Sequence, residues 1–339
     1  MRIGRILAIG VVSLASLIVI GTAVIAVRVL APSRNETQQN FAPPEGQQSI
    51  SKVGGMSLSS QSSGNSSFLY RASAPGGAKA RLTSVSSGIE SEASFSHDGK
   101  LVVYAYARAA DSKSSIWVVG SDGKNARAMT AMDEDALHPV FSPDDSKVFY
   151  ATSSFTGNHS PIARPARHDW DVLSIPIQAG AAVVGATPLK ITHQSLYDLR
   201  SLDVAPDGIN PGGIKLLVST SGYPIGELIK EFNLGAEGRD KIFQPHVPGE
   251  SSVGPAFGEA RFVHDGMDIL FLAATDTSGG NYDYNVFSMS DTTGGELKQL
   301  THLKGMTTDL RVLPNSNATF VNGSRTYSLD VAAQTVRPI

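Results

Sequence analysis

The chain has 339 residues, of which 41% are hydrophobic and 17% are charged, with a formal net charge of −3. This length and apolar content suffice for one large domain with a packed core. There is no cysteine, which excludes disulfides, thiolate nucleophiles and cysteine-ligated zinc or iron–sulfur centres. Without the N-terminal Arg2, Arg5 and Arg28, 25 basic residues face 31 acidic ones, a balance that argues against nucleic-acid binding.

The N-terminus carries a long apolar stretch, because residues 6–27 contain neither charge nor proline. As a helix this stretch would be about 33 Å long, enough to cross a bilayer. It exceeds the roughly 7–15 apolar residues of a signal peptide, although residues 24–26 leave cleavage open. We therefore predict an uncleaved transmembrane anchor in residues 1–30. Arg2 and Arg5 favour a cytoplasmic N-terminus, with the remainder on the extracytoplasmic or periplasmic side of an inner membrane.

Residues 31–66 are rich in Ser, Gln, Asn, Gly and Pro. Such a segment has too little apolar surface to offset the entropy of ordering, so we expect a flexible linker. A free tether is favoured over a segment that becomes ordered along a partner.

A short motif recurs in the rest of the chain. The sequence FSHDGK at 95–100 places an Asp-Gly pair between two β-rich runs, which predicts a hairpin because glycine accepts positive φ. Related copies are FSPDDSK at 141–147, VAPDG at 204–208, FVHDG at 262–266 and a degraded VLPNS at 312–316.

The copies start 46, 63, 58 and 50 residues apart, as expected for a β-propeller in which each repeat forms one four-stranded blade. Most copies are followed by a third apolar run and a second turn. The third runs are 116–119, 172–175 and 286–289, and the turns are 122–123, 179–180 and 294–295. Each of these units then closes with an apolar residue and threonine: Met129-Thr130, Ile191-Thr192 and Leu300-Thr301.

This order of turn, strand, second turn and final apolar-Thr pair resembles the repeat of the TolB-like β-propeller family over residues 67–339. The resemblance implies an all-β, six-bladed propeller, with five blades as the alternative. Residues 68–83 resemble the last two strands of an incomplete first blade. Proteins of the TolB type carry an α/β domain before the propeller, where this sequence has an anchor and a linker. Fold alone does not fix function.

Two insertions depart from the repeat and are candidate partner contacts. Residues 153–170 form either a basic finger or a solvated hairpin, with the hairpin favoured. In residues 223–238 the apolar spacing i, i+3, i+4, i+7 predicts a short amphipathic helix that covers an edge or docks a neighbour. The candidate partner-binding residues are Arg164, Arg167, His168, Ile225, Leu228 and Phe232. The loop 276–283 carries oxygen ligands for calcium, but a polar hairpin is favoured.

The chain contains neither an H-E-x-x-H nor a G-x-S-x-G motif. We expect no catalytic, cofactor-binding or metal-binding residue. The leading hypothesis is a non-catalytic, membrane-anchored accessory or scaffolding subunit of a larger membrane complex, with respiratory and photosynthetic assemblies as candidate hosts. The alternatives are an envelope sensor that binds a solute or glycan, and a propeller hydrolase or lyase whose active site is dispersed among blades.

Overall fold

The computed structural model describes residues 51–53, 55–73, 77–110, 112–157, 166–178, 181–182, 186–208, 212–222, 226–234, 240–247, 257–276 and 282–339. Within these ranges, no helix is long and apolar enough to cross a membrane. The predicted anchor and the linker up to residue 50 lie outside the described residues.

The described part is all-β. Four of its five sheets are antiparallel units, and the eight-stranded sheet β1–β8 divides into two more at a parallel contact between Ser67 and Ile89. We call these six units blades 1 to 6. Blade 1 comprises β1 (Ser51–Val53), β2 (Met56–Ser63), β3 (Ser66–Ala72) and β4 (Ala80–Arg81). Blade 2 comprises β5 (Ile89–Phe95), β6 (Leu101–Ala107), β7 (Ser114–Gly120) and β8 (Arg127–Ala128). Blade 3 comprises β9 (Ala136–Phe141), β10 (Lys147–Gly157), β11 (Ala166–Gln178), β12 (Ala181–Ala182) and β13 (Leu189–Lys190). Blade 4 comprises β14 (Ser201–Pro206), β15 (Ile214–Gly222), β16 (Gly226–Leu234) and β17 (Lys241–Phe243). Blade 5 comprises β18 (Phe257–Val263), the 3₁₀ turn η1 (His264–Gly266), β19 (Asp268–Asp276), β20 (Asp283–Ser290) and β21 (Lys298–Gln299). Blade 6 comprises β22 (Thr307–Val312), β23 (Ala318–Asn322), β24 (Arg325–Asp330) and β25 (Thr335–Pro338).

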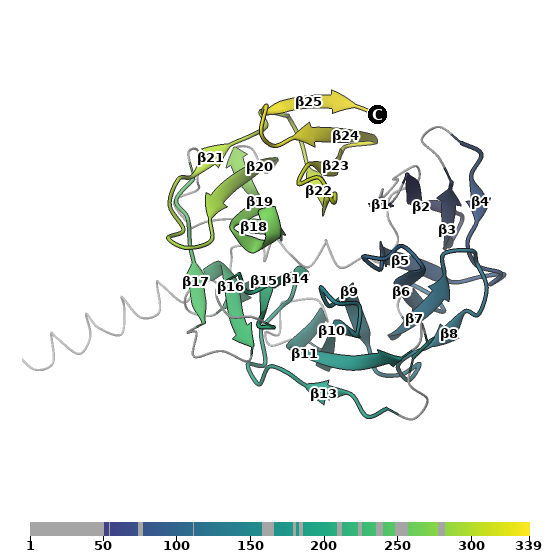
Figure 1. Ribbon diagram of the computed structural model, residues 1–339. Helices are drawn as coiled ribbons and strands as arrows, with labels where there is room; N and C mark the ends of the chain where they lie inside the picture. The colour runs from purple at the N-terminus through teal and green to yellow at the C-terminus, as the bar shows by residue number, and fades with distance from the viewer. Residues whose placement is uncertain are drawn as a thin grey trace, which may run out of the picture. The chain divides into compact units, whose positions relative to one another are not determined.

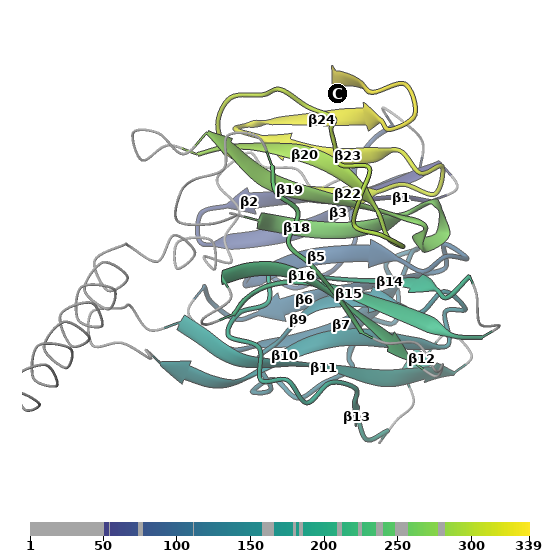
Figure 2. The same cartoon turned by 90° about the vertical axis from the view of Figure 1, so that its left-hand side faces the viewer.

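Apart from the end of β10 and the start of β11, the blades belong to one compact unit, and they follow one another around a ring (Figure 1). The first strands of blades 2 to 6 (β5, β9, β14, β18 and β22) lie nearest the middle of the ring (Figure 1), and each of the first four contacts the first strand of the next blade. Figure 2 shows the ring from its side, with strands running roughly along the ring axis. This arrangement is a β-propeller.

The predicted repeats coincide with the blades. Each Asp-Gly type turn joins the first strand of a blade to the second, and the predicted third strands are β7, β11 and β20. The apolar-Thr endings have a physical reason. The threonine hydroxyls of Thr130, Thr192 and Thr301 accept hydrogen bonds from the backbone N–H groups of Ile116, Val172 and Val286, at 2.9, 2.9 and 2.8 Å. Each threonine thereby satisfies a buried third-strand N–H.

Blade 1 is complete, so the expectation of a blade that lacks its beginning is wrong. β1 and β2 occupy residues that composition assigned to the linker. Leu58, Ser59 and Ser60 are consecutive and all buried, so β2 shows no apolar alternation. The small serine side chains of β2 fit between packed sheets. Because a serine-rich segment also has the composition of a linker, the sequence predicts a linker here.

The prediction of an amphipathic helix in residues 223–238 is also wrong, because residues 226–234 form strand β16. Leu228, Ile229, Glu231 and Phe232 are all buried. A strand that lies between neighbouring blades packs on both faces, so its apolar residues lose the period of two and here match a helical spacing instead.

Apolar cores fill the spaces between successive blades. One cluster joins blades 2, 3 and 4, a second joins blades 4 and 5, a third joins blades 5 and 6, and a fourth joins blades 1 and 2. Among the described residues, no such cluster joins blade 6 to blade 1. The junction between the two terminal blades therefore lacks the apolar cluster that the other junctions have.

Candidate functional site

Charged side chains recur at two positions of the innermost strands. Counted back from the apolar residue that leads each turn motif, position −3 holds Glu92, His138, Glu259 and Asp309 in blades 2, 3, 5 and 6. Position −1 holds Asp203, Arg261 and Arg311 in blades 4, 5 and 6. We call these seven residues the axial cluster, because their strands surround the middle of the ring (Figure 1).

A β-bulge sets the orientation of position −3. The pairing of the first and second strands shifts register at this point in blades 2, 3, 5 and 6. Glu92, His138 and Asp309 have φ values of 53°, 52° and 56°, a left-handed conformation that non-glycine residues seldom adopt. Bulges of this kind redirect a side chain and are common beside functional sites.

Three axial carboxylates each link one blade to the next. Glu92 accepts a hydrogen bond from the backbone N–H of His138 at 2.5 Å. Asp203 accepts one from the N–H of Phe262 at 2.7 Å, and Glu259 accepts one from the N–H of Asp309 at 2.6 Å. The pairs join blades 2 and 3, 4 and 5, and 5 and 6, so the same device is repeated around the ring.

The two arginines neutralise two of these carboxylates. Arg261 Nη2 lies 2.8 Å from Glu259 Oε2, and Arg311 Nε lies 2.9 Å from Asp309 Oδ1. Arg311 also donates from Nη1 to the backbone oxygen of Ala93, 3.3 Å away in blade 2. This bond reaches from blade 6 to blade 2, past blade 1, and adds a polar tie near the junction that lacks an apolar cluster among the described residues.

The cluster is partly open to water. The side chains of Glu92, Glu259, Arg261 and Arg311 are 27%, 20%, 13% and 16% exposed. His138 also faces the cluster, with Nδ1 3.3 Å from Glu92 Oε1 and Nε2 3.1 Å from the backbone oxygen of Leu199.

Charges on several blades influence the pKa values of this cluster. Burial lowers the pKa of His138, and Arg261 and Arg311 lower it further, while Glu92 opposes them. Burial also raises the pKa of Glu259, which Arg261 counteracts. His138 belongs to blade 3 and the two arginines to blades 5 and 6, so their fields overlap across the ring axis.

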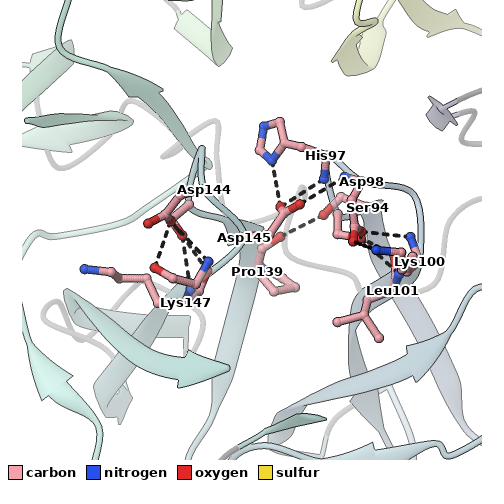
Figure 3. A network of polar contacts seen from close by, with 12 residues as sticks. Ser94, His97, Asp98, Lys100, Leu101, Pro139, Asp144, Asp145 and Lys147 are labelled. Carbon is pink, nitrogen blue, oxygen red and sulfur yellow. Dashed lines mark hydrogen bonds and ion pairs between the residues drawn. The ribbon is translucent and has the colours of Figure 1, made fainter. Parts of the chain in front are cut away.

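A second polar network joins the turns of blades 2 and 3 (Figure 3). The Asp145 carboxylate accepts from the backbone N–H of His97 at 2.9 Å and from that of Asp98 at 3.0 Å, and it lies 2.8 Å from His97 Nδ1. Within each turn a serine hydroxyl donates to an aspartate, as Ser142 does to Asp144 at 2.6 Å. Hydrogen bonds from Ser142 and Ser146 lower the pKa of Asp144 to about 2. The serine and aspartate of the Ser-x-Asp pattern therefore stabilise the turn, which gives the pattern a structural role.

The structure describes four of the predicted partner-binding residues, and all four are buried. Arg167 lies in β11 and forms a buried ion pair with Asp135, 2.8 Å away. His168 is buried, with Nδ1 2.9 Å from the backbone oxygen of Tyr197. Leu228 and Phe232 are buried in β16. Arg164, Ile225 and residues 277–281 of the calcium candidate loop lie outside the described residues.

Sequence reasoning missed the axial cluster, although a signal was present. The turn motif aligns the copies, and the residues just before each turn fit a strand without indicating a site. Positions −3 and −1 of the five copies comprise ten residues, and seven of these are charged or histidine. Within the described part of the chain, no group of three or more His, Asp or Glu side chains is arranged to hold a metal ion.

Comparison with solved structures identifies the fold. A protein from Agrobacterium tumefaciens described as TolB aligns over 78% of this chain and 83% of its own, with 19% identity and a TM-score of 0.54. TolB from Acinetobacter baumannii aligns over 80% of this chain and 60% of its own, with 15% identity and a TM-score of 0.54. An oligogalacturonate lyase in complex with manganese aligns over 88% of this chain and 79% of its own, with 12% identity and a TM-score of 0.54.

No protein-family model matches the chain, and no curated protein matches it in sequence. At these identities the structural likeness shows a β-propeller fold and nothing of the chain's activity.

Proposed function

We propose that this chain is a non-catalytic binding propeller that holds a partner protein at its axial cluster. In this proposal it serves as an accessory or scaffolding subunit of a larger membrane complex. The predicted anchor in residues 6–27 tethers it to the bilayer and leaves the propeller on the extracytoplasmic side, and a respiratory or photosynthetic assembly is a candidate host.

The observation that carries the proposal is the bonding of the axial cluster. Each of its charged side chains is bound to a backbone group of the next blade or to an opposite charge. Glu92, Asp203 and Glu259 each hold a backbone N–H of the next blade with one carboxylate oxygen, so their positions are fixed before a partner arrives. A polar surface whose geometry is fixed in advance suits binding, because less ordering is needed when the partner docks.

The cluster also has the composition of a protein-binding surface. It offers carboxylates and guanidinium groups side by side, and the side chains keep between an eighth and a third of their surface in water. Arginine donates in a fixed planar fork, and it is enriched at the energetic centres of protein interfaces.

The test uses the full chain with a C-terminal tag, solubilised from native membranes in mild detergent. The change is Arg261→Gln or Arg311→Gln, and Arg325→Gln on the exposed face of β24 serves as the matched control. We expect a stoichiometric partner that co-purifies with the unmodified chain and with Arg325→Gln, and is reduced at least tenfold with the axial variants. Retention of that partner by folded axial variants, with unchanged melting temperatures, would contradict the proposed site.

A second candidate rests on the same partly exposed cluster, namely a sensor that binds a polar solute or glycan. This candidate predicts that the chain is recovered without any partner and that its melting temperature rises when a charged sugar is added. That shift would be absent in Arg261→Gln and present in Arg325→Gln.

A further inference from the structure

A second charged cluster lies away from the axis, at the contact between blades 4 and 5. It contains Lys215 of β15, Glu231 of β16, Lys241 of β17 and Asp291, which follows β20. We call it the blade 4–5 cluster. Lys215 Nζ lies 2.8 Å from Asp291 Oδ2, and Lys241 Nζ lies 3.1 Å from both Asp291 Oδ2 and Glu231 Oε1.

Burial makes this cluster unusual. The Glu231 side chain is 0% exposed, those of Asp291 and Lys215 are 6% and 8% exposed, and only Lys241 reaches water, at 35%. The remaining neighbours are neutral: Asn233 Nδ2 donates to Glu231 Oε1 at 3.2 Å, and Lys215 donates to the backbone oxygen of Gly266 at 2.6 Å. The ring of Phe262 lies 5.2 Å from Lys215 Nζ.

Each carboxylate retains one buried oxygen that accepts nothing. In the described part of the chain, neither Glu231 Oε2 nor Asp291 Oδ1 has a hydrogen-bond donor. An unsatisfied buried carboxylate oxygen is costly. A proton held between the two carboxylates would supply the missing donor, as it does in other closely spaced carboxyl pairs.

We propose that Glu231 and Asp291 share one proton in the folded protein, which makes the contact between blades 4 and 5 a pH-sensitive link that is stronger at pH 5 than at pH 8. This inference stands apart from the proposed binding role, since none of the four residues belongs to the axial cluster.

The direction of the pH dependence follows from the ionisation of Glu231 and Asp291. Burial, with the neighbouring Asp291, raises the pKa of Glu231 from 4.5 to about 7. Burial alone would raise the pKa of Asp291 too, but hydrogen bonds with Glu231, Lys215 and Lys241 lower it. The proton therefore resides on Glu231. Between pH 4.5 and 7 the folded chain binds more protons than the unfolded chain, so its stability falls as the pH rises through this window.

The experiment measures the unfolding equilibrium of the full chain in detergent at pH values from 5 to 8. Glu231→Gln keeps the shape of the protonated side chain and removes its titration. Glu296→Gln, in the exposed turn that follows Asp291, is the matched control. We expect the unfolding constant of the unmodified chain to rise between pH 5 and 8 by on the order of 100-fold more than that of Glu231→Gln. The Glu296→Gln control should follow the unmodified chain.

A pH dependence of Glu231→Gln that runs parallel to that of the unmodified chain would overturn the proposal. If Glu231→Gln does not fold, Asp291→Asn replaces it, because it removes the neighbour that adds to burial in raising the Glu231 pKa and is expected to reduce the pH dependence. The unmodified chain gives a third readout by infrared spectroscopy. A protonated carboxyl band present at pH 5.5 and lost by pH 8 is expected, and the absence of such a band at pH 5.5 contradicts the shared proton.

Discussion

At the scale of single residues, the recurring motif of this chain divides into parts with different physical tasks. The threonine that ends a repeat accepts a hydrogen bond from a third-strand N–H, and the aspartate of the turn accepts from a serine hydroxyl. Thr83 of blade 1 occupies the same place as these threonines. There the third-strand N–H of Leu69 donates instead to Glu90, at 2.9 Å. A buried carboxylate of blade 2 has thus taken over the acceptor role.

The role of the threonine can be tested at Thr130. Thr130→Val keeps the side-chain shape and leaves the backbone N–H of Ile116 without its acceptor, which should cost about 1–3 kcal/mol of unfolding free energy. Thr335→Val, at an exposed position of β25, is the control and should change stability by less than about 0.5 kcal/mol. Equal effects in chemical denaturation would show that the Thr130 hydroxyl is not needed.

At the scale of elements, the blades interlock through their turns as well as through their apolar faces. The second turn of blade 5 lies against blade 4, where a Cβ at Gly294 would be 2.9 Å from the ring of Phe243. The second turn of blade 2 lies against blade 1, where a Cβ at Gly123 would be 2.8 Å from the backbone oxygen of Leu82. Both glycines also have positive φ, so the sequence needs glycine there for two reasons.

The two reasons can be separated with a pair of substitutions. Gly323 in blade 6 has φ +61°, close to the +65° of Gly294, but nothing lies within 4 Å of its Cβ position. Gly323→Ala should therefore show only the backbone cost of about 1–2 kcal/mol. Gly294→Ala should lose more, because the ring of Phe243 must also move. If both variants have the same melting temperature, the turn of blade 5 does not press on blade 4 as described.

The elements also show how far sequence reasoning reaches. The turns were predicted because Asp-Gly chemistry is local, and the spacing of the copies then led to blades. β16 was mistaken for a helix because it is buried on both faces. The axial cluster does not follow from the same reasoning, because position −3 lies at β-bulges that break the strand alternation at Glu92, His138 and Asp309. A bulge leaves no mark in composition, and only comparison of the same position across repeats could indicate it.

At the scale of the whole molecule, the ring is held by apolar clusters between successive blades and by polar ties near its axis. Blades 1 and 6 each consist of strands from one end of the described chain, so no shared strand closes the ring. The bond from Arg311 to the backbone oxygen of Ala93 compensates in part, and it assigns the axial cluster a structural task besides the proposed binding one.

The measurement that tests the binding site most directly is cross-linking from the axis. Because the chain has no cysteine, a single introduced cysteine is a unique attachment point for a thiol-reactive photo-cross-linker. Ser94→Cys lies at position −1 of blade 2, among the axial residues, and Thr335→Cys lies at an exposed position of the outer strand β25. In native membranes we predict that Ser94→Cys forms a defined cross-linked product with a second protein and that Thr335→Cys does not. A product from Thr335→Cys alone, with Ser94→Cys labelled but unlinked, would contradict an axial binding site.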